Sequence, residues 1–151
     1  PLLFHLLEQR GALLDLHFML QKEVVDRMAA GPGSKSYGRL SVMLAAYCTV
    51  EKLFDVGCGA FSPPPKVQSS VVRLIPSAAP RFEFGADAAL AAVVGAAFGQ
   101  RRKTLRNSLQ ALLGAADLTA CDIDPQRRAE TLSPAEFGRL ALRFQAAGAG
   151  S

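Results

Sequence analysis

The sequence lacks the residue patterns of a metal-binding site and of a membrane-spanning helix. It contains no tryptophan, two histidines and three cysteines. Cys48, Cys58 and Cys121 have no metal-ligand spacing, and neither histidine lies near any of them, so we expect reduced thiols and no metal site. No apolar stretch approaches the length of a membrane span, and no secretory signal pattern is present. These absences predict a cytoplasmic protein.

A glycine-rich loop that follows a strand is also missing. None of the 13 glycines forms a G-x-G-x-x-G pattern. A nucleotide-type cofactor normally binds on such a loop, so we expect the main site for one to be incomplete in this chain. Charged residues make up only 20% of the sequence and half of the residues are apolar, which indicates a folded domain. The net charge of +4 favours an anionic partner only mildly.

The sequence begins at Pro1, without an initiator methionine, directly inside a helical pattern. Proline is favoured at the first position of a helix. We therefore expect a helix over residues 1–7, and we expect the chain to be a fragment of a longer protein.

The first half of the chain alternates helical and strand patterns. Leu16 to Leu20 is a continuous apolar run, which predicts a strand buried on both faces, with His17 packed inside it. Strands are also predicted at Val50–Val56 and Val67–Leu74. Because only about ten residues join these two strands, they should be antiparallel neighbours. Two further helices are predicted, at Gln21–Met28 and Tyr37–Cys48.

This order of elements predicts an α/β fold over residues 1–76. It is typical of the second half of a mostly parallel sheet that has an antiparallel strand at its end. Residues 77–86 are predicted to be a linker. Strand patterns stop after it, so residues 87–151 should form a small all-α domain.

Four helices are expected in the all-α domain. The first is capped by Asp87, the second carries Leu105, Leu109 and Leu112 on one face, and a short third helix starts at Asp124. Ser133 and Glu136 have the spacing of a capping box for the last helix. The buried stripe of that helix is expected to be Phe137, Leu140, Ala141 and Phe144.

The loop before the last strand carries one aromatic residue next to three prolines. Phe61 is followed by Pro63, Pro64 and Pro65 and then by Lys66. Prolines lock the backbone in an extended form, which fixes where Phe61 and Lys66 point. An aromatic ring beside a cation suits stacking on a base near a phosphate. Two alternatives stay open: Phe61 is a core residue, or the prolines form a ligand for an aromatic groove.

The densest group of charged residues in the chain lies just before and at the start of the second predicted helix of the all-α domain. Arg101, Arg102, Lys103 and Arg106 are all cations and have no acidic residue four positions away, while Asn107 and Gln110 add polar groups. Such a polar stripe suits phosphate contacts. The alternative is an ordinary solvated helix face, in which case Lys22, Lys35, Arg39 and Lys66 become the expected phosphate contacts.

Lys22 follows the first strand, at the strand end where open α/β sheets place their ligands. An ordinary helix start explains this position equally well.

Five segments, taken in order, resemble the small-subunit ribosomal RNA adenine N6-dimethyltransferases. The resemblance covers nearly the whole chain, from Pro1 to about Phe144. The segments are Gln21–Arg27, Tyr37–Ser41, Ala60–Leu74, Arg102–Asn107 and Arg128–Ser133.

The resemblance implies a class I methyltransferase fold followed by a small helical domain, with S-adenosylmethionine as the methyl donor. It implies two adjacent adenosines of small-subunit ribosomal RNA, in a pre-small ribosomal subunit, as substrates. We expect the enzyme to be a monomer. It also implies that Phe61 stacks on the flipped target base. The RNA contacts that we assign on this basis are Lys22, Lys66, Arg101, Arg102, Lys103, Arg106 and Asn107.

In that family the cofactor loop and the catalytic Asn-Leu-Pro-Tyr motif precede the segments found here, so we expect both of them upstream of Pro1. The chain alone is therefore expected neither to bind S-adenosylmethionine nor to methylate RNA. Two other functions stay open: a large-subunit ribosomal RNA adenine methyltransferase that confers antibiotic resistance, and a non-catalytic module for RNA binding or ribosome assembly.

Overall fold

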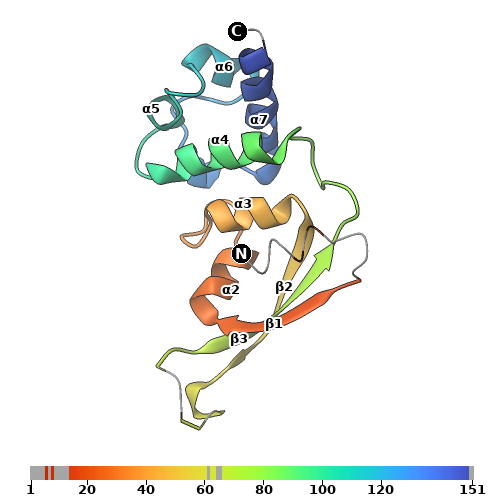
Figure 1. Ribbon diagram of the computed structural model, residues 1–151. Helices are drawn as coiled ribbons and strands as arrows, with labels where there is room; N and C mark the ends of the chain where they lie inside the picture. The colour runs from red at the N-terminus through yellow and green to blue at the C-terminus, as the bar shows by residue number, and fades with distance from the viewer. Residues whose placement is uncertain (1–5, 7, 9–13, 61, 64–65, 150–151) are drawn as a thin grey trace.

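The computed structural model describes residues 6, 8, 14–60, 62–63 and 66–149 of the chain, so most of the helix predicted for residues 1–7 lies outside the described residues. Its lower part is a twisted sheet of three strands, with helices on one side (Figure 1). The strands lie in the order β1 (Leu16–Gln21), β3 (Ser69–Pro76) and β2 (Cys48–Val56). Both β1 and β2 are antiparallel to β3. The predicted antiparallel pairing is confirmed, but the last strand, β3, lies in the middle of the described sheet.

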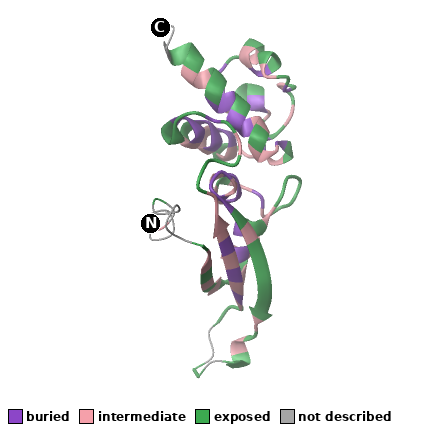
Figure 2. Cartoon of the chain, turned by 90° about the vertical axis from the view of Figure 1, so that its right-hand side faces the viewer, coloured by how far each residue is buried: buried purple, intermediate pink, exposed green. Residues whose placement is uncertain are grey.

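Residues along β3 alternate between buried and partly buried, which gives that strand its alternating colours in Figure 2, whereas most of β2 is exposed. Val72 and Leu74 of β3 are fully buried on the helical side. On the opposite side, Met19 is 53% exposed and the side chain of His17 is 51% exposed. The predictions that β1 is buried on both faces and that His17 is packed are therefore wrong. An unbroken apolar run does not reveal that only one face of its strand is covered by helices.

Helices α2 (Lys22–Ala29) and α3 (Arg39–Ala45) cover the buried face of the sheet. Val25 and Met28 of α2 and Leu44 of α3 are buried there. The α3 helix is shorter than predicted, because the chain turns after Ala45 and enters β2. Strand β3 also begins later than predicted, because Val67 is 49% exposed in the preceding loop.

The segment between β3 and α4, residues 77–86, is fastened to the turn that joins α3 to β2. Phe84 is 1% exposed and its ring lies 6.0 Å from that of Tyr47. The backbone N–H of Ser77 donates to the carbonyl of Tyr47 at 2.8 Å, and that of Arg81 donates to Ala46 at 2.9 Å. The predicted linker therefore packs on the first half of the chain.

The remaining residues form the helical part that was predicted. Its long helices α4 and α7 pack together, and the shorter elements surround them (Figure 1). The predicted capping box is present, since the N–H of Glu136 donates to Ser133 Oγ at 3.2 Å and the N–H of Ser133 donates to Glu136 Oε1 at 3.0 Å. The elements are α4 (Asp87–Gly99), α5 (Leu105–Ser108), α6 (Ala115–Ala120), η3 (Ala129–Thr131) and α7 (Pro134–Ala149).

Three details of this part differ from the sequence prediction. Asp87 is the first residue of α4 and makes no capping bond; it accepts a hydrogen bond from the Tyr47 hydroxyl instead. The chain turns at Asp124, where a helix was predicted, since the Asp124 side chain accepts the N–H of Gln126 at 2.9 Å. Helix α6 was not predicted.

A single hydrophobic core crosses from the sheet part to the helical part. The ring of Tyr37, which is 1% exposed, lies 5.8 Å from the ring of Phe98 in α4. Its hydroxyl donates to the carbonyl of Leu132 at 2.7 Å. Nearby, the N–H of Gly33 donates to the carbonyl of Glu130 at 2.8 Å. The two parts are therefore joined by packing and by hydrogen bonds, of which the one between Tyr37 and Leu132 is buried.

Candidate functional site

The proline loop begins with the short helix η2 (Cys58–Ala60) and leads into β3. Phe61, Pro64 and Pro65 lie outside the described residues, so the structure does not test the stacking assignment of Phe61. Lys66 is exposed, and its side chain makes no hydrogen bond or ion pair with any described residue. It remains a candidate phosphate contact on geometric grounds.

The catalytic motif was expected upstream of Pro1, and Pro1 itself also lies outside the described residues. The structure therefore does not test where that motif lies.

Lys22 is held by its neighbours. Its ammonium group lies 2.7 Å from Asp26 Oδ2, and Lys52 approaches the other carboxylate oxygen at 3.1 Å. Hydrogen bonds from Lys22 and from Lys52 hold the pKa of Asp26 below its ordinary value. The backbone N–H of Lys22 donates to the carbonyl of Gln68 at 2.9 Å, which joins α2 to the start of β3. Because its charge is already compensated, Lys22 is a weaker candidate for a phosphate contact than an unpaired cation.

Arg101 differs from the rest of its cluster because its guanidinium is occupied by the protein. Nε lies 3.2 Å from Glu130 Oε2, and Nη1 donates to the carbonyl of Tyr37 at 2.6 Å. Nη2 donates to the carbonyls of Ser34 at 3.3 Å and of Lys35 at 3.1 Å. The guanidinium also lies over the Phe98 ring, 5.7 Å from its centroid. Through these contacts, Arg101 links the sheet part to the helical part.

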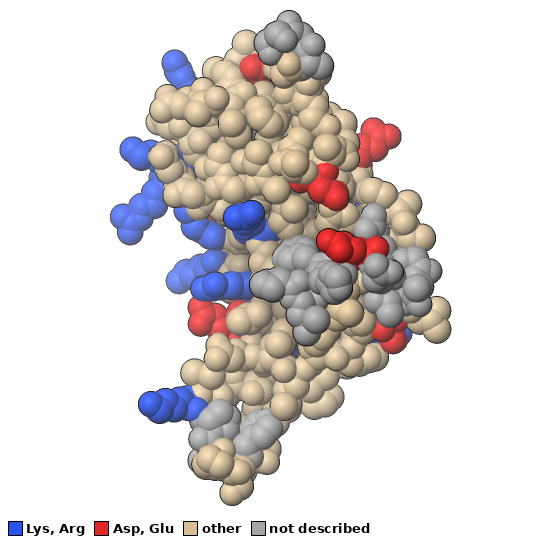
Figure 3. Space-filling view, in the orientation of Figure 1, with Lys and Arg blue, Asp and Glu red and all other residues tan. Residues whose placement is uncertain are grey.

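The other cations of the cluster point to solvent. Arg102, Lys103 and Arg106 are exposed, and their side chains have no hydrogen bond or ion pair among the described residues. Lys and Arg side chains gather on the same side of the molecule, over the helical part and its junction with α2 and α3 (Figure 3). The neighbouring leucines face the other way, since Leu105 and Leu109 are fully buried.

Helix α5 is shorter than the sequence indicated, which changes its buried stripe. It ends at Ser108, so the third buried leucine is Leu113, at 2% exposure, and Leu112 is only partly buried. Asn107 and Gln110 are exposed beside Arg106, as expected. The polar face of the predicted helix therefore exists, although most of it lies in turns.

A second segment joins this polar face and was missed by the sequence reasoning. The N–H of Leu105 donates to the carbonyl of Arg127 at 2.8 Å, and that of Arg106 donates to Pro125 at 3.0 Å. These bonds bring Gln126 to Asn107 and Gln110, where all three line a polar cavity of about 530 Å³. Only the fold brings Gln126 there.

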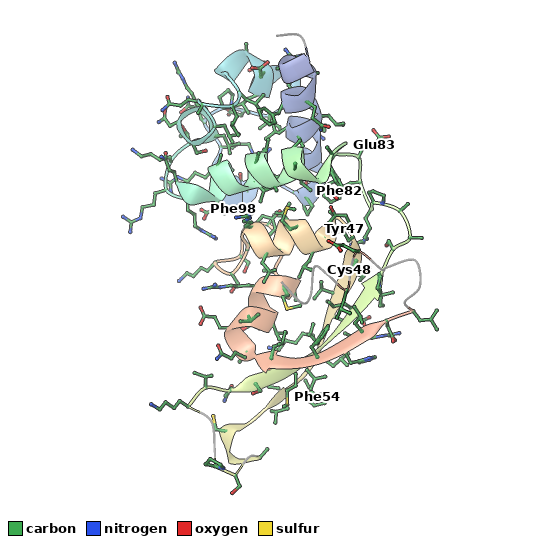
Figure 4. All side chains as sticks on the ribbon, viewed as in Figure 1. Tyr47, Cys48, Phe54, Phe82, Glu83 and Phe98 are labelled. Carbon is green, nitrogen blue, oxygen red and sulfur yellow. The ribbon has the colours of Figure 1, made fainter. Side chains whose placement is uncertain are left out.

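A larger cavity lies at the junction of the two parts. It measures about 660 Å³ and lies among α2, α3, the end of α4 and the chain before α3. Phe98 lies on the side of α4 that faces α3 (Figure 4). The lining residues are Arg27, Lys35, Ser36, Gly38, Arg39, Leu40, Ser41, Met43, Phe98 and Arg101.

Burial holds two of the three thiols in the protonated form. Cys48 is buried, and this burial raises the pKa of its thiol to about 11. Burial also raises the pKa of the Cys121 thiol. No group of three or more potential metal ligands occurs among the residues that the structure describes. In the same residues, no helix is long and apolar enough to cross a membrane.

The chain is similar in sequence to known proteins. The sequence model of the family described as ribosomal RNA adenine dimethylase matches residues 1–146. Proteins named ribosomal RNA small subunit methyltransferase A are similar to the chain in Xanthomonas campestris pv. campestris (strain 8004) and in Nitrosococcus oceani. Each is 60% identical, over 141 and 140 residues respectively. These matches cover 93% and 91% of this chain, but 54% and 52% of the relatives. The chain thus spans about half the length of the curated relatives that it matches.

Two solved structures have a similar fold. A dimethyladenosine transferase from Plasmodium falciparum matches 98% of this chain and 63% of its own chain, with a TM-score of 0.81 and 25% identity. The 23S rRNA methyltransferase ErmE matches 87% of this chain and 55% of its own, with a TM-score of 0.61 and 23% identity. The second likeness concerns the fold alone.

Proposed function

The chain belongs to the ribosomal RNA adenine dimethylase family, and from this premise we propose that it is part of a methyltransferase acting on adenines of small-subunit ribosomal RNA. The substrate within this proposal is a pair of adjacent adenosines in a pre-small ribosomal subunit. The methyl donor is S-adenosylmethionine. The enzyme is monomeric and cytoplasmic.

The observation that carries the proposal is the set of unpaired cations on one side of the helical part. Arg102, Lys103 and Arg106 have no protein partner among the described residues, so their charges are available to a polyanion. Phosphate contacts of this kind position an RNA without reading its sequence. Asn107 and Gln110, on the same side, can donate hydrogen bonds to phosphate or sugar oxygens.

The proposed chemistry is direct transfer of a methyl group. The bond between the methyl carbon and the sulfonium sulfur of a bound donor would break as a bond to adenine N6 forms, and the N6 proton would pass to solvent. In the product the sulfur is a neutral thioether. A second transfer to the same nitrogen gives the dimethylated base.

Within this chain, Phe61 is proposed to stack on the flipped adenine, and Lys66 to hold the adjacent phosphate. The cofactor is proposed to bind mainly to residues outside these 151, because the chain has no glycine-rich loop that follows a strand.

The proposal is tested with the full-length protein and with this chain, each incubated with small-subunit particles that lack the modification. Full-length protein should transfer radioactive methyl groups from S-adenosylmethionine to the RNA, and the 151-residue chain should not. Phe61→Ala in the full-length protein should lower turnover far more than RNA affinity. Stacking on one base contributes about 1–3 kcal/mol, while phosphate contacts dominate affinity. If Phe61 is a core residue, the variant should instead unfold at a lower temperature.

A large-subunit substrate is the second candidate, but no observation favours it, since the resemblance to ErmE concerns the fold alone. Methyl transfer to large-subunit RNA but not to small-subunit particles would overturn the proposal.

A further inference from the structure

The cavity of about 660 Å³ at the junction of the two parts has two chemically different regions. Its floor is apolar, with Leu40 and Met43 of α3 and Phe98 of α4, all of them only partly buried. Its rim is cationic and holds two exposed side chains, Lys35 and Arg39. An apolar floor beside positive charge complements a molecule that is flat and apolar at one end and anionic at the other.

Not all the cations around the cavity are available to a ligand. Arg101 is held by Glu130 and by the carbonyls of Tyr37, Ser34 and Lys35. Arg27 is paired with Glu23, with Nη2 2.6 Å from Oε1. By contrast, the side chains of Lys35 and Arg39 make no hydrogen bond or ion pair with any residue that the structure describes.

The fixed cation has a different use. The Arg101 guanidinium lies over Phe98, and its orientation is set by four hydrogen bonds. Unpaired RNA bases stack on guanidinium planes as well as on aromatic rings, and here the guanidinium covers one face of the Phe98 ring. The size of the cavity lies within the range of pockets that hold small ligands of about nucleotide size.

We infer that this cavity takes one unstacked nucleotide of the bound ribosomal RNA. Its base lies on the floor formed by Leu40, Met43 and Phe98, and its phosphates contact Lys35 and Arg39. The inference rests on the proposed function. It adds a second point at which a base, and not only the phosphate backbone, contributes to binding, apart from the target adenine.

The test compares two single-stranded RNA probes, a hexa-adenylate and a ribose-phosphate hexamer of the same length without bases. Binding is measured by fluorescence anisotropy over a range of salt concentrations. Every protein carries Phe61→Ala, so that the stacking proposed for Phe61 makes no contribution. Without further changes, the hexa-adenylate should bind about tenfold more tightly than the abasic probe, as expected for one stacked base.

Met43→Trp fills the floor of the cavity without changing its charge. It should reduce the tenfold ratio to about one, with unchanged affinity for the abasic probe and an unchanged salt slope. Met19→Trp is the matched control, because Met19 is exposed on the outer face of the sheet, and it should keep the ratio. The chain has no native tryptophan, so the emission of each variant reports the environment of the new side chain.

Thermal melting shows whether Met43→Trp is folded, and Leu40→Trp replaces it if it is not. Lys35→Ala with Arg39→Ala should make the salt slope shallower by about one to two units and also lower the ratio. A ratio near one before the cavity is filled would overturn the inference, as would a tenfold ratio that survives a folded, filled cavity. Methyl transfer by the full-length protein is a separate result, so either of these outcomes can occur while the proposed function stands.

Discussion

The hydroxyl of Tyr37 donates a hydrogen bond of 2.7 Å to the carbonyl oxygen of Leu132, and both residues are buried. The bond joins the residue that lies just before α3 to the residue that precedes the capping box of α7, across the junction of the two parts. Burial raises the pKa of the Tyr37 phenol, so the hydroxyl keeps its proton and remains a donor throughout the physiological range.

We expect Tyr37→Phe to lower the free energy of unfolding by about 1–3 kcal/mol, because the Leu132 carbonyl loses its partner in a buried site. Tyr47→Phe is the matched control. The Tyr47 hydroxyl donates to Asp87, which is exposed, so water can replace that bond and the loss should be smaller. Urea unfolding of both variants measures the difference. Equal losses would mean that full burial of the junction bond adds nothing to its contribution.

Arg101 and Arg102 are adjacent in the sequence and should behave in opposite ways. Arg101→Ala removes the donor to Glu130 and to the carbonyls of Tyr37 and Lys35, so we expect it to lower the melting temperature clearly. Arg102→Ala removes an exposed and unpaired side chain, so stability should change by less than about 0.5 kcal/mol. RNA affinity should fall in Arg102→Ala without a change in melting. The reverse pattern would contradict the role of Arg101 in linking the sheet part to the helical part.

This pair shows where prediction from the sequence ends. The run Arg101–Arg106 marks a cationic segment, but the partners of Arg101 are residues 34, 35, 37 and 130. No local pattern can indicate partners so far apart in the chain. The sequence therefore predicted RNA contacts for all four cations, although the fold pairs one of them, Arg101, with groups of the protein. The family resemblance had the same limit, since it carried over a segment and not the surroundings of each side chain.

Periodicity succeeded where the burial of an element depends on its own residues. It predicted both long helices of the helical part, together with the capping box at Ser133. It failed for His17, because the other residues of Leu16–Leu20 are apolar and burial of a second face depends on what packs there. It also failed at Asp124, where a side chain that could cap a helix instead closes a turn by accepting the N–H of Gln126.

The carboxylate of Glu136 should make stability depend on pH. Its side chain is 18% exposed. Burial opposes the charge, but bonds from Arg127 and from the Ser133 backbone more than offset this and hold the pKa of Glu136 below its ordinary value. A depressed pKa stabilises the fold above the unfolded value of 4.5, and this contribution is lost as the pH falls through the folded pKa.

We therefore expect Glu136→Gln to be less stable than the native chain by about 1–2 kcal/mol at neutral pH. The difference should shrink as the pH is lowered through the folded pKa, because the native carboxylate is then also neutral. Ser133→Ala removes the other half of the capping box and should still destabilise the chain in acid. Chemical unfolding at several pH values measures each difference, and a constant cost for Glu136→Gln would contradict the linkage.

The unpaired cations on the helical part should control how RNA binding depends on salt. Arg102→Ala combined with Arg106→Ala should make the slope of log affinity against log salt shallower by roughly 0.7 to 0.9 for each phosphate that is no longer neutralised. Which adenosines are modified should not change, since phosphate contacts position and do not specify. Leu105 and Leu109 face the core, so melting should be unaffected. An unchanged slope would show that these residues form only a solvated surface.

Two helical glycines, Gly138 of α7 and Gly95 of α4, should respond oppositely to alanine. A Cβ on Gly138 would clash with the carbonyl oxygen of Glu83 and lie 2.8 Å from Cδ2 of Phe82, whereas one on Gly95 would meet nothing within 4 Å. Figure 4 shows Phe82 and Glu83 beside α7, in the segment that leads into α4. The first glycine therefore provides the space in which that segment packs on α7.

We expect Gly138→Ala to destabilise the chain by about 1–3 kcal/mol, because the clash involves a backbone atom, and the segment must shift to relieve it. Gly95→Ala should stabilise it by about 0.5–1 kcal/mol, since alanine is the better helix former and nothing opposes its methyl group. Phe82→Ala removes only the softer of the two contacts, so it should not rescue Gly138→Ala. Differential scanning calorimetry measures the change in stability of each of the three variants. A stabilising Gly138→Ala would mean that the segment before α4 does not pack against α7 in solution.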